Sequence, residues 1–104
     1  MADEVIYKTP GERIRYDYDF SPLLPSTDAT ITMAVTALDE ELVSATSTVI
    51  GTTSTSGTTG TADFQAGTDG KDYTITMRAT GATSSVIRDW IVEMRVRSKI
   101  GGQV

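Results

Sequence analysis

The chain has 104 residues and carries 14 acidic against 9 basic side chains, which gives a formal net charge of −5. It contains no cysteine and no histidine, which excludes a disulfide framework, a thiolate metal site and the Ser–His or Cys–His pairs of nucleophilic enzymes. An acidic chain also lacks the basic stripe that nucleic-acid binders use to displace counterions from phosphates. We therefore predict a non-enzymatic protein without catalytic, cofactor-binding or metal-binding residues, without a cofactor and without a nucleic-acid partner.

The length of the chain suits one domain with a single hydrophobic core, spanning residues 1–104. The opening residues MADEVIYKTP lack the apolar core of a secretory signal, and no apolar run approaches the roughly 20 residues that a membrane-spanning helix needs. We expect the protein to have no membrane partner and to remain in the cytoplasm, unless it leaves as part of an assembly.

Two stretches in the first half alternate between apolar and polar residues, as half-buried strands do. Residues 12–20 place three aromatic residues and Ile14 on one face, with two arginines and two aspartates on the other. Residues 29–37 place Ile31, Met33, Val35 and Ala37 inward and threonines outward. Pro22 and Pro25 cannot donate ladder hydrogen bonds, so we predict that the chain leaves the sheet between these two strands.

The middle of the chain is less regular. Residues 38–42 (LDEEL) fit either a helical turn or an acidic hairpin loop, and residues 43–50 predict a third strand with a weak apolar side. Residues 51–60 (GTTSTSGTTG) contain no large apolar side chain, and we expect a long flexible loop or a loop with a ragged edge strand. Residues 61–65 predict a short strand anchored by Phe64.

The last third returns to clear alternation. After the turn signal at residues 66–71, Tyr73, Ile75, Met77 and Ala79 share one face. Residues 85–97 predict the final strand, with Trp90, Val92, Met94 and Val96 inward. Arg88 shares that inward face and Ile91 the outward one, so we predict a bulge or a change of sheet near residue 88 or 89.

Short strands separated by turn signals, without a helical period of useful length, predict an all-β fold. The seven aromatic residues suit one two-sheet core, so we predict an antiparallel β-sandwich of about seven strands rather than a barrel. Residues 1–11 form an N-terminal arm and residues 98–104 a flexible tail in this prediction.

The second half also carries a family resemblance, from TADFQ through WIVEMRV. It resembles small phage virion proteins with an immunoglobulin-like fold, of the fibre–tail adaptor, head fibre or tail-associated type. The first half is similar to the opening of such proteins through YDYDFSPLLPSTDATI. The matching positions in the second half are Gly67, Gly70, Tyr73, Ile75, Thr76, Arg78, Asp89, Met94, Arg95 and Val96.

This resemblance implies an immunoglobulin-like sandwich that serves as a bacteriophage virion structural protein, in a tail, adaptor or decoration role. It implies assembly with other virion proteins, including copies of itself, and location in the virion and, during assembly, in the host cytoplasm. It also implies that Tyr73 packs its ring in the core and bonds its hydroxyl to nearby backbone, as in a tyrosine corner. The alternative is a carbohydrate-binding or adhesion module, for which Trp90, Tyr7 and Tyr18 are the candidate stacking residues.

Two acidic groups have the composition of a calcium or paired-carboxylate site. Asp17 and Asp19 share a strand face about 7 Å apart. Because Arg13 and Arg15 lie on the same face, we predict a solvated, self-paired strand instead. The second group, residues 39–41, is accompanied by no further ligand pattern.

Charge and loop composition leave two questions open. Residues before position 70 carry 11 acids and 3 bases, whereas those from 70 onward carry 3 acids and 6 bases. This asymmetry either cancels between neighbouring strands or creates an acidic face and a basic edge that suit head-to-tail packing. Arg95, Arg97 and Lys99 either protect a sheet edge or meet the acidic first strand of another copy. The loop at 51–60 lacks the lysine of a phosphate loop and serves either as a solvated loop or as a contact with a neighbour or a sugar.

Overall fold

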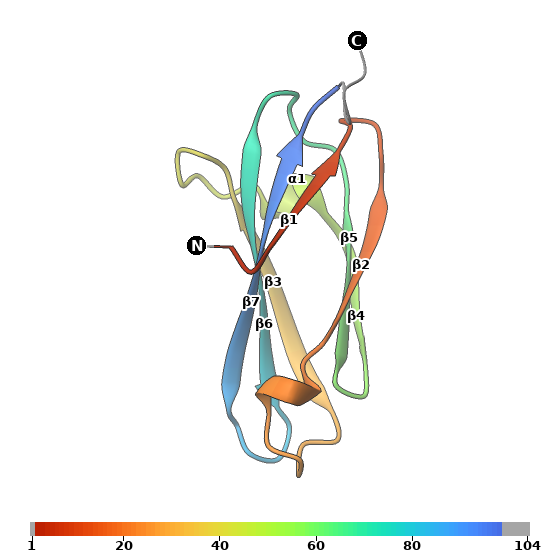
Figure 1. Cartoon of the computed structure of the whole chain (residues 1–104), viewed down its shortest axis with the longest axis vertical. Helices are drawn as coiled ribbons and strands as arrows, with labels where there is room; N and C mark the ends of the chain where they lie inside the picture. The colour runs from red at the N-terminus through yellow and green to blue at the C-terminus, as the bar shows by residue number, and fades with distance from the viewer. Residues whose placement is uncertain (1, 99–104) are drawn as a thin grey trace.

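Seven strands form two sheets in the computed structural model, which describes residues 2–98 (Figure 1). One sheet has four strands in the order β1-β7-β6-β3, and the other has three in the order β2-β5-β4. The predicted all-β sandwich of about seven strands is confirmed. The strands are β1 (Glu4–Lys8), β2 (Ile14–Asp19), β3 (Ile31–Leu38), β4 (Ile50–Ser56), β5 (Thr59–Phe64), β6 (Asp72–Gly81) and β7 (Ile87–Val96). Two short helices accompany them, η1 (Ser21–Leu23) and α1 (Thr46–Val49).

The core lies between the two sheets and is built from alternating residues of the facing strands. Strand β6 buries every second residue and β7 does so from residue 92 onward, as their sequences predict. Strand β3 contributes Ile31 and Ala37, and β5 contributes Ala62 and Phe64. The residues of β6 and β7 in this core are Tyr73, Ile75, Met77, Ala79, Val92, Met94 and Val96.

The aromatic side chains of β2 point inward and pack against β5 and β7. Tyr16 stacks on Phe64 with ring centroids 5.4 Å apart, and Tyr18 stacks on Trp90 at 4.0 Å. The Trp90 indole Nε1 donates to the Tyr16 hydroxyl at 2.8 Å, and that hydroxyl donates to the carboxylate of Glu4. Burial, reinforced by the Glu4 hydrogen bond, raises the pKa of Tyr16 to about 12.

The predicted N-terminal arm is wrong for residues 4–8, which form β1. This strand runs parallel to β7 and pairs with it from Glu4↔Val92 to Lys8↔Val96, so the sandwich is not purely antiparallel. Lys8 is fully buried, and its Nζ donates to the carbonyls of Thr9 at 2.6 Å and Ala66 at 2.5 Å. Burial lowers the pKa of Lys8. The segment escaped prediction because five residues with one buried side chain give no readable period.

The middle of the chain also differs from the prediction. Residues 46–49 form α1 rather than a strand. Of the two alternatives for residues 51–60, the flexible loop is wrong, whereas the edge strand is present as β4 and forms a β-hairpin with the first part of β5. Gly57 supplies the positive φ (59°) that the tight hairpin turn requires. Threonine favours extended backbone even where it buries nothing, so a strand exposed on its faces forms without apolar alternation.

The bulge predicted near residue 88 is absent from the described structure, since β6 and β7 pair without a register shift from Asp72↔Arg95 to Thr80↔Ile87. Arg88 does have the inward parity, opposite the buried Ala79 of β6, but its side chain is exposed. Its Nε donates to the Leu23 carbonyl in η1 at 3.0 Å. The end of the sandwich therefore accommodates the charge without a distortion of the strand.

The prediction for Tyr73 is confirmed. Its ring is 4% exposed, and its hydroxyl accepts a hydrogen bond from the backbone N–H of Thr68 at 2.9 Å. This contact ties the β5–β6 connection to the start of β6. Of the predicted tail, Ser98 is held by Asp69 through its N–H and its hydroxyl, both at 2.8 Å, and residues 99–104 lie outside the described residues.

Candidate functional site

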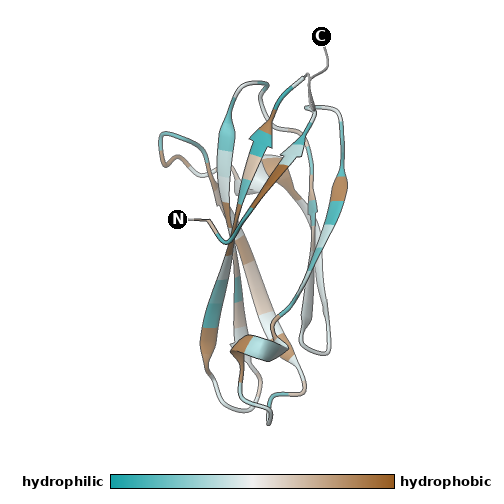
Figure 2. Ribbon diagram, viewed as in Figure 1, coloured by the Kyte–Doolittle hydropathy of each residue, from teal (hydrophilic) through white to brown (hydrophobic). Residues whose placement is uncertain are grey.

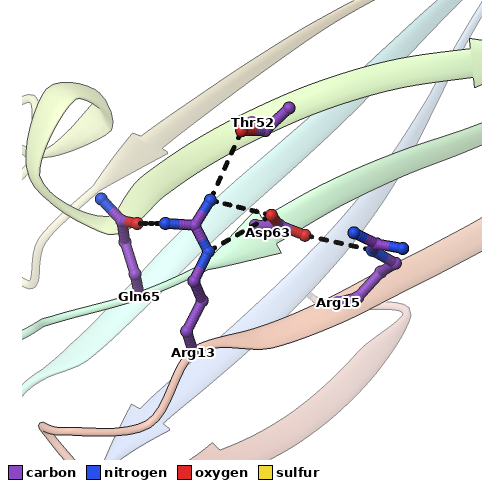
Figure 3. Close-up of polar contacts among 5 residues, drawn as sticks. All are labelled: Arg13, Arg15, Thr52, Asp63 and Gln65. Atoms are coloured by element: carbon purple, nitrogen blue, oxygen red, sulfur yellow. Dashed lines mark hydrogen bonds and ion pairs between the residues drawn. The ribbon is translucent and has the colours of Figure 1, made fainter.

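The most organised group of polar side chains lies on the outer face of the three-stranded sheet. Because Ala62 and Phe64 point into the core, Asp63 between them points outward. Strand β2 places Arg15 directly opposite Asp63, and Arg13 lies just before the start of β2. Figure 3 shows both arginines converging on this carboxylate from the same side of the sheet.

Asp63 is only 7% exposed because the arginines cover it. Arg13 donates to Asp63 Oδ2 from Nη2 at 2.9 Å and from Nε at 3.3 Å, and Arg15 Nε donates to Oδ1 at 3.4 Å. Arg13 also donates to Gln65 Oε1 at 2.7 Å and to Thr52 Oγ1 at 3.4 Å, which links β2, β4 and β5. The hydrogen bonds and charge of Arg13, followed by those of Arg15, hold the pKa of Asp63 below its usual range.

A shallow polar depression of about 250 Å³ adjoins this cluster. The side chain of Arg15 is 72% exposed above it and has donors to spare beyond its one long bond to Asp63. The depression therefore presents unused hydrogen-bond donors of Arg15 to solvent. Its lining residues are Arg15, Asp17, Thr52, Ser54, Thr61 and Asp63.

The predicted pairing within β2 is wrong, since Arg13 and Arg15 bind Asp63 of the neighbouring strand. Asp19 instead accepts from the N–H of Ser21 at 2.9 Å and from the hydroxyl of Thr58 at 2.8 Å. Residues directly opposite each other on adjacent strands lie about 5 Å apart, closer than the roughly 7 Å between alternate residues of one strand. The outward parity of Asp63 was readable from the sequence, but its partners depend on strand register.

The acidic residues 39–41 form the tip of a turn, not a helix, and the structure groups no three acidic side chains as a metal site within residues 2–98. The carboxylate of Asp39 accepts from the backbone N–H of Glu41 at 2.9 Å and of Val43 at 3.0 Å, and lies 3.8 Å from Lys71 Nζ. These contacts, with the N–H of Val43 first, lower the pKa of Asp39. The carboxylate therefore stabilises the turn.

Of the two roles considered for Arg95, Arg97 and Lys99, protection of a sheet edge is wrong, because β7 lies between β1 and β6. Arg95 pairs with Glu93 at 2.6 Å and donates to the Tyr7 hydroxyl at 3.0 Å, and Arg97 pairs with Asp72 at 2.9 Å. Lys99 lies outside the described residues. The other prediction, contact with another copy, remains a prediction.

Two of the three candidate sugar-stacking residues point between the sheets, where Trp90 and Tyr18 stack on each other. Tyr7 is exposed on β1, but Arg95 lies over its ring at 5.7 Å from the centroid. The three rings thus form no shared platform. No helix in the part of the chain that the structure describes has the length and apolar character to cross a bilayer.

The geometry around Asp63 predicts that the two arginines affect its pKa to different extents. In a carbon-detected NMR titration, Arg13→Gln is expected to raise the pKa of Asp63 toward its usual value. The reason is that Arg13 donates two hydrogen bonds to Asp63, both shorter than the one from Arg15. Arg15→Gln is expected to raise this pKa less. Arg78→Gln, which removes an ion pair on the other sheet, serves as the control and should leave Asp63 unchanged. Equal shifts in all three variants would contradict the geometry.

Comparison with curated proteins gives no match, and neither does comparison with solved structures. A family model does match, over residues 8–92, which run from the last residue of β1 into β7 and cover the polar cluster and most of both sheets. That model describes the podophage GP4 fiber-tail adaptor protein gp77. The chain belongs to this family of phage fiber-tail adaptor proteins.

Proposed function

We propose that this protein is a non-enzymatic structural component of a phage virion, which joins the tail to its fibres through protein–protein contacts. The observation that carries the proposal is the family match over residues 8–92. Its partners are then other virion proteins and copies of itself, and its site of action is the assembled particle.

We further infer an immunoglobulin-like fold. In the constant-type immunoglobulin sandwich, with strands lettered A to G in chain order, B, E and D share one sheet and C, F and G the other. The orders β2-β5-β4 and β3-β6-β7 reproduce both sets. The Tyr73 hydroxyl bond at the β5–β6 corner supports the same assignment. Strand β1 differs by joining the sheet of C, F and G.

An adaptor must hold two different neighbours, and the sandwich offers two outer faces of unlike chemistry. The outer face of β2-β5-β4 is polar and carries the Arg13–Arg15–Asp63 cluster. The outer face of the four-stranded sheet carries internally paired charges, such as Arg78 with Asp89 at 2.8 Å, together with exposed apolar side chains. These apolar residues are Val5, Tyr7, Leu38 and Ile87. The two faces suit partners of different polarity.

The proposal is tested with phage that cannot produce this chain. Electron microscopy of the particles is expected to show tails without fibres, and host adsorption is expected to fall, with both restored when the chain is supplied in trans. Mass spectrometry of wild-type particles should find the chain in a fixed ratio to the tail proteins. Fibres that remain attached in its absence, or particles that do not contain it, would overturn the adaptor role.

A further inference from the structure

Strand β4 forms an edge of the three-stranded sheet, and only its first two residues, Ile50 and Gly51, are half-buried. All residues from Thr52 to Ser56 are solvent-exposed, including Thr53 and Thr55, which lie opposite the buried Ala62 and Gly60 of β5. Figure 2 draws this strand in pale tones, because threonine and serine are neither strongly hydrophilic nor hydrophobic. The residues of β4 from Thr52 onward are thus exposed to solvent, although β3 of the other sheet lies close to the strand.

The hydrogen-bond pattern identifies, for each residue of β5, whether its backbone N–H and C=O groups face β2 or β4. The N–H of Phe20 donates to the carbonyl of Thr58 at 3.0 Å, which continues the β2–β5 ladder by one hydrogen-bonded pair. Bonded and non-bonded pairs alternate in an antiparallel ladder. Gly60 and Ala62 therefore also direct their backbone groups toward β2.

The intervening residues of β5 direct theirs toward β4. Thr61 lies opposite Ser54, so Ser54 is bonded to β5, whereas Thr53 and Thr55 direct their N–H and C=O groups away from it. The register irregularity lies between Ile50 and Thr53, so the stretch from Thr53 onward is regular. Within residues 2–98 no backbone hydrogen bond from outside the sheet reaches Thr53 or Thr55.

Proteins normally protect such an edge with charges, prolines or a covering segment. The edge strand β1 carries Glu4 and Lys8, and β2 carries Arg15 and two aspartates. Strand β3 has no charge, but the segment before α1 covers part of its edge, since Ala45 N–H donates to the Ala37 carbonyl at 2.9 Å. Strand β4 contains neither a charge nor a proline, and no backbone hydrogen bond from another segment of residues 2–98 occupies its outer edge at Thr53 or Thr55.

We propose that β4 pairs antiparallel with β4 of a second copy of this chain, which joins two three-stranded sheets into one of six strands. A chain of net charge −5 repels its copies, and β4 is a stretch without charge where two copies approach without opposing like charges. Because every residue from 52 to 56 is threonine or serine, antiparallel registers all bring together threonine and serine side chains, which pair favourably. A two-fold axis satisfies the outward groups of both strands at once.

The contact is small. Stable interfaces bury roughly 1,200–2,000 Å², and one strand pair of this length falls below that range. The isolated chain is therefore expected to associate weakly. Copies held side by side by a larger particle would pair far more completely, because their effective concentration is high.

The test uses the intact chain, followed by sedimentation equilibrium from micromolar to millimolar concentration and by amide exchange in NMR. We expect a monomer–dimer equilibrium, with the Thr53 and Thr55 amides gaining protection as the dimer forms. Thr55→Pro removes an N–H that faces away from β5, so the β4–β5 ladder persists while dimerisation weakens about tenfold or more. Thr55→Lys should weaken it similarly without altering the backbone.

The matched control is Thr74→Lys, which adds the same charge at an exposed position of β6, away from β4. It should leave the dimerisation constant within about twofold of wild type. A chain that stays monomeric at millimolar concentration overturns the proposal, and so does a dimer that Thr55→Pro and Thr55→Lys leave intact. Protection of these amides only after addition of a purified tail or fibre protein would assign the edge to that partner instead and would also overturn self-pairing.

Discussion

Replacing Phe64 by alanine is expected to destabilise the protein by about 3–5 kcal/mol. Phe64 is fully buried in the central strand of the three-stranded sheet and stacks on Tyr16 with an interplanar angle of 19°. Its removal leaves a cavity between the sheets, and the rigid strands on both sides prevent the core from closing over it. Urea unfolding followed by circular dichroism measures the loss.

The matched control is Ile87→Ala, which truncates a large apolar residue exposed on β7. Its free energy of unfolding is expected to stay within about 0.5 kcal/mol of wild type. If Phe64→Ala cost no more than Ile87→Ala, the two sheets would not share the core described above.

Gly81→Ala is expected to cost about 3 kcal/mol through overpacking and the loss of buried hydrogen bonds. A Cβ on Gly81 would lie 2.6 Å from Asp28 Cγ and 2.8 Å from Ser84 Oγ. Asp28 cannot easily retreat, because its carboxylate accepts from the N–H of Thr83 at 2.9 Å and from the N–H and hydroxyl of Ser84 at 2.8 and 2.5 Å. These bonds hold the β6–β7 turn.

Gly11→Ala is the control for this change, since a Cβ there meets nothing within 4 Å. We expect it to be neutral or slightly stabilising, because alanine restricts the unfolded chain. Chemical unfolding of the two variants, measured in parallel, distinguishes the close contact of Gly81 with Asp28 and Ser84 from a general effect of replacing glycine by alanine. A Gly81→Ala variant as stable as Gly11→Ala would contradict the close approach of Asp28.

The same contact depends on pH. The Ser84 hydroxyl, with the N–H groups of Ser84 and Thr83, holds the pKa of Asp28 below its usual range. The unfolded chain therefore takes up this proton first as the pH falls, and the stability from the ionised carboxylate is complete only above the unfolded pKa of about 3.9. This contribution to stability disappears as the pH drops through the lower pKa that Asp28 has in the folded protein. The difference in the free energy of unfolding between wild type and Gly81→Ala is accordingly expected to become smaller at acid pH.

Strands that face the core on one side could be predicted from the sequence, because burial imposes a period of two. Tyr73 to Ala79 and Trp90 to Val96 show this period. Strands β1 and β4 could not, because each lies at an edge where few side chains are buried and the alternation is lost. Threonine-rich segments satisfy the backbone as strands and resemble loops in composition.

For the polar cluster, the face on which its residues lie could be predicted from the sequence, but their contacts could not. The outward parity of Arg13, Arg15 and Asp63 follows from their apolar neighbours, but the choice of partner depends on which strands are adjacent. Strand β5 lies next to β2, although residues 20–58 separate the two strands in sequence, and the register sets Arg15 against Asp63. A single sequence contains no direct signal of that register.

The parallel pairing of β1 with β7 determines how the chain responds to tension. Both strands point the same way, so the start of β1 and the end of β7 lie at opposite ends of the paired segment (Figure 1). A pull applied through the two ends of the described chain loads the β1–β7 hydrogen bonds in shear, all at once, instead of peeling them apart one by one. Failure then requires several bonds to break together, and the Nζ of the buried Lys8 must leave the carbonyl of Ala66 in the same event. In a particle whose fibres exert force on the tail, the paired strands β1 and β7 would act as a mechanical clamp.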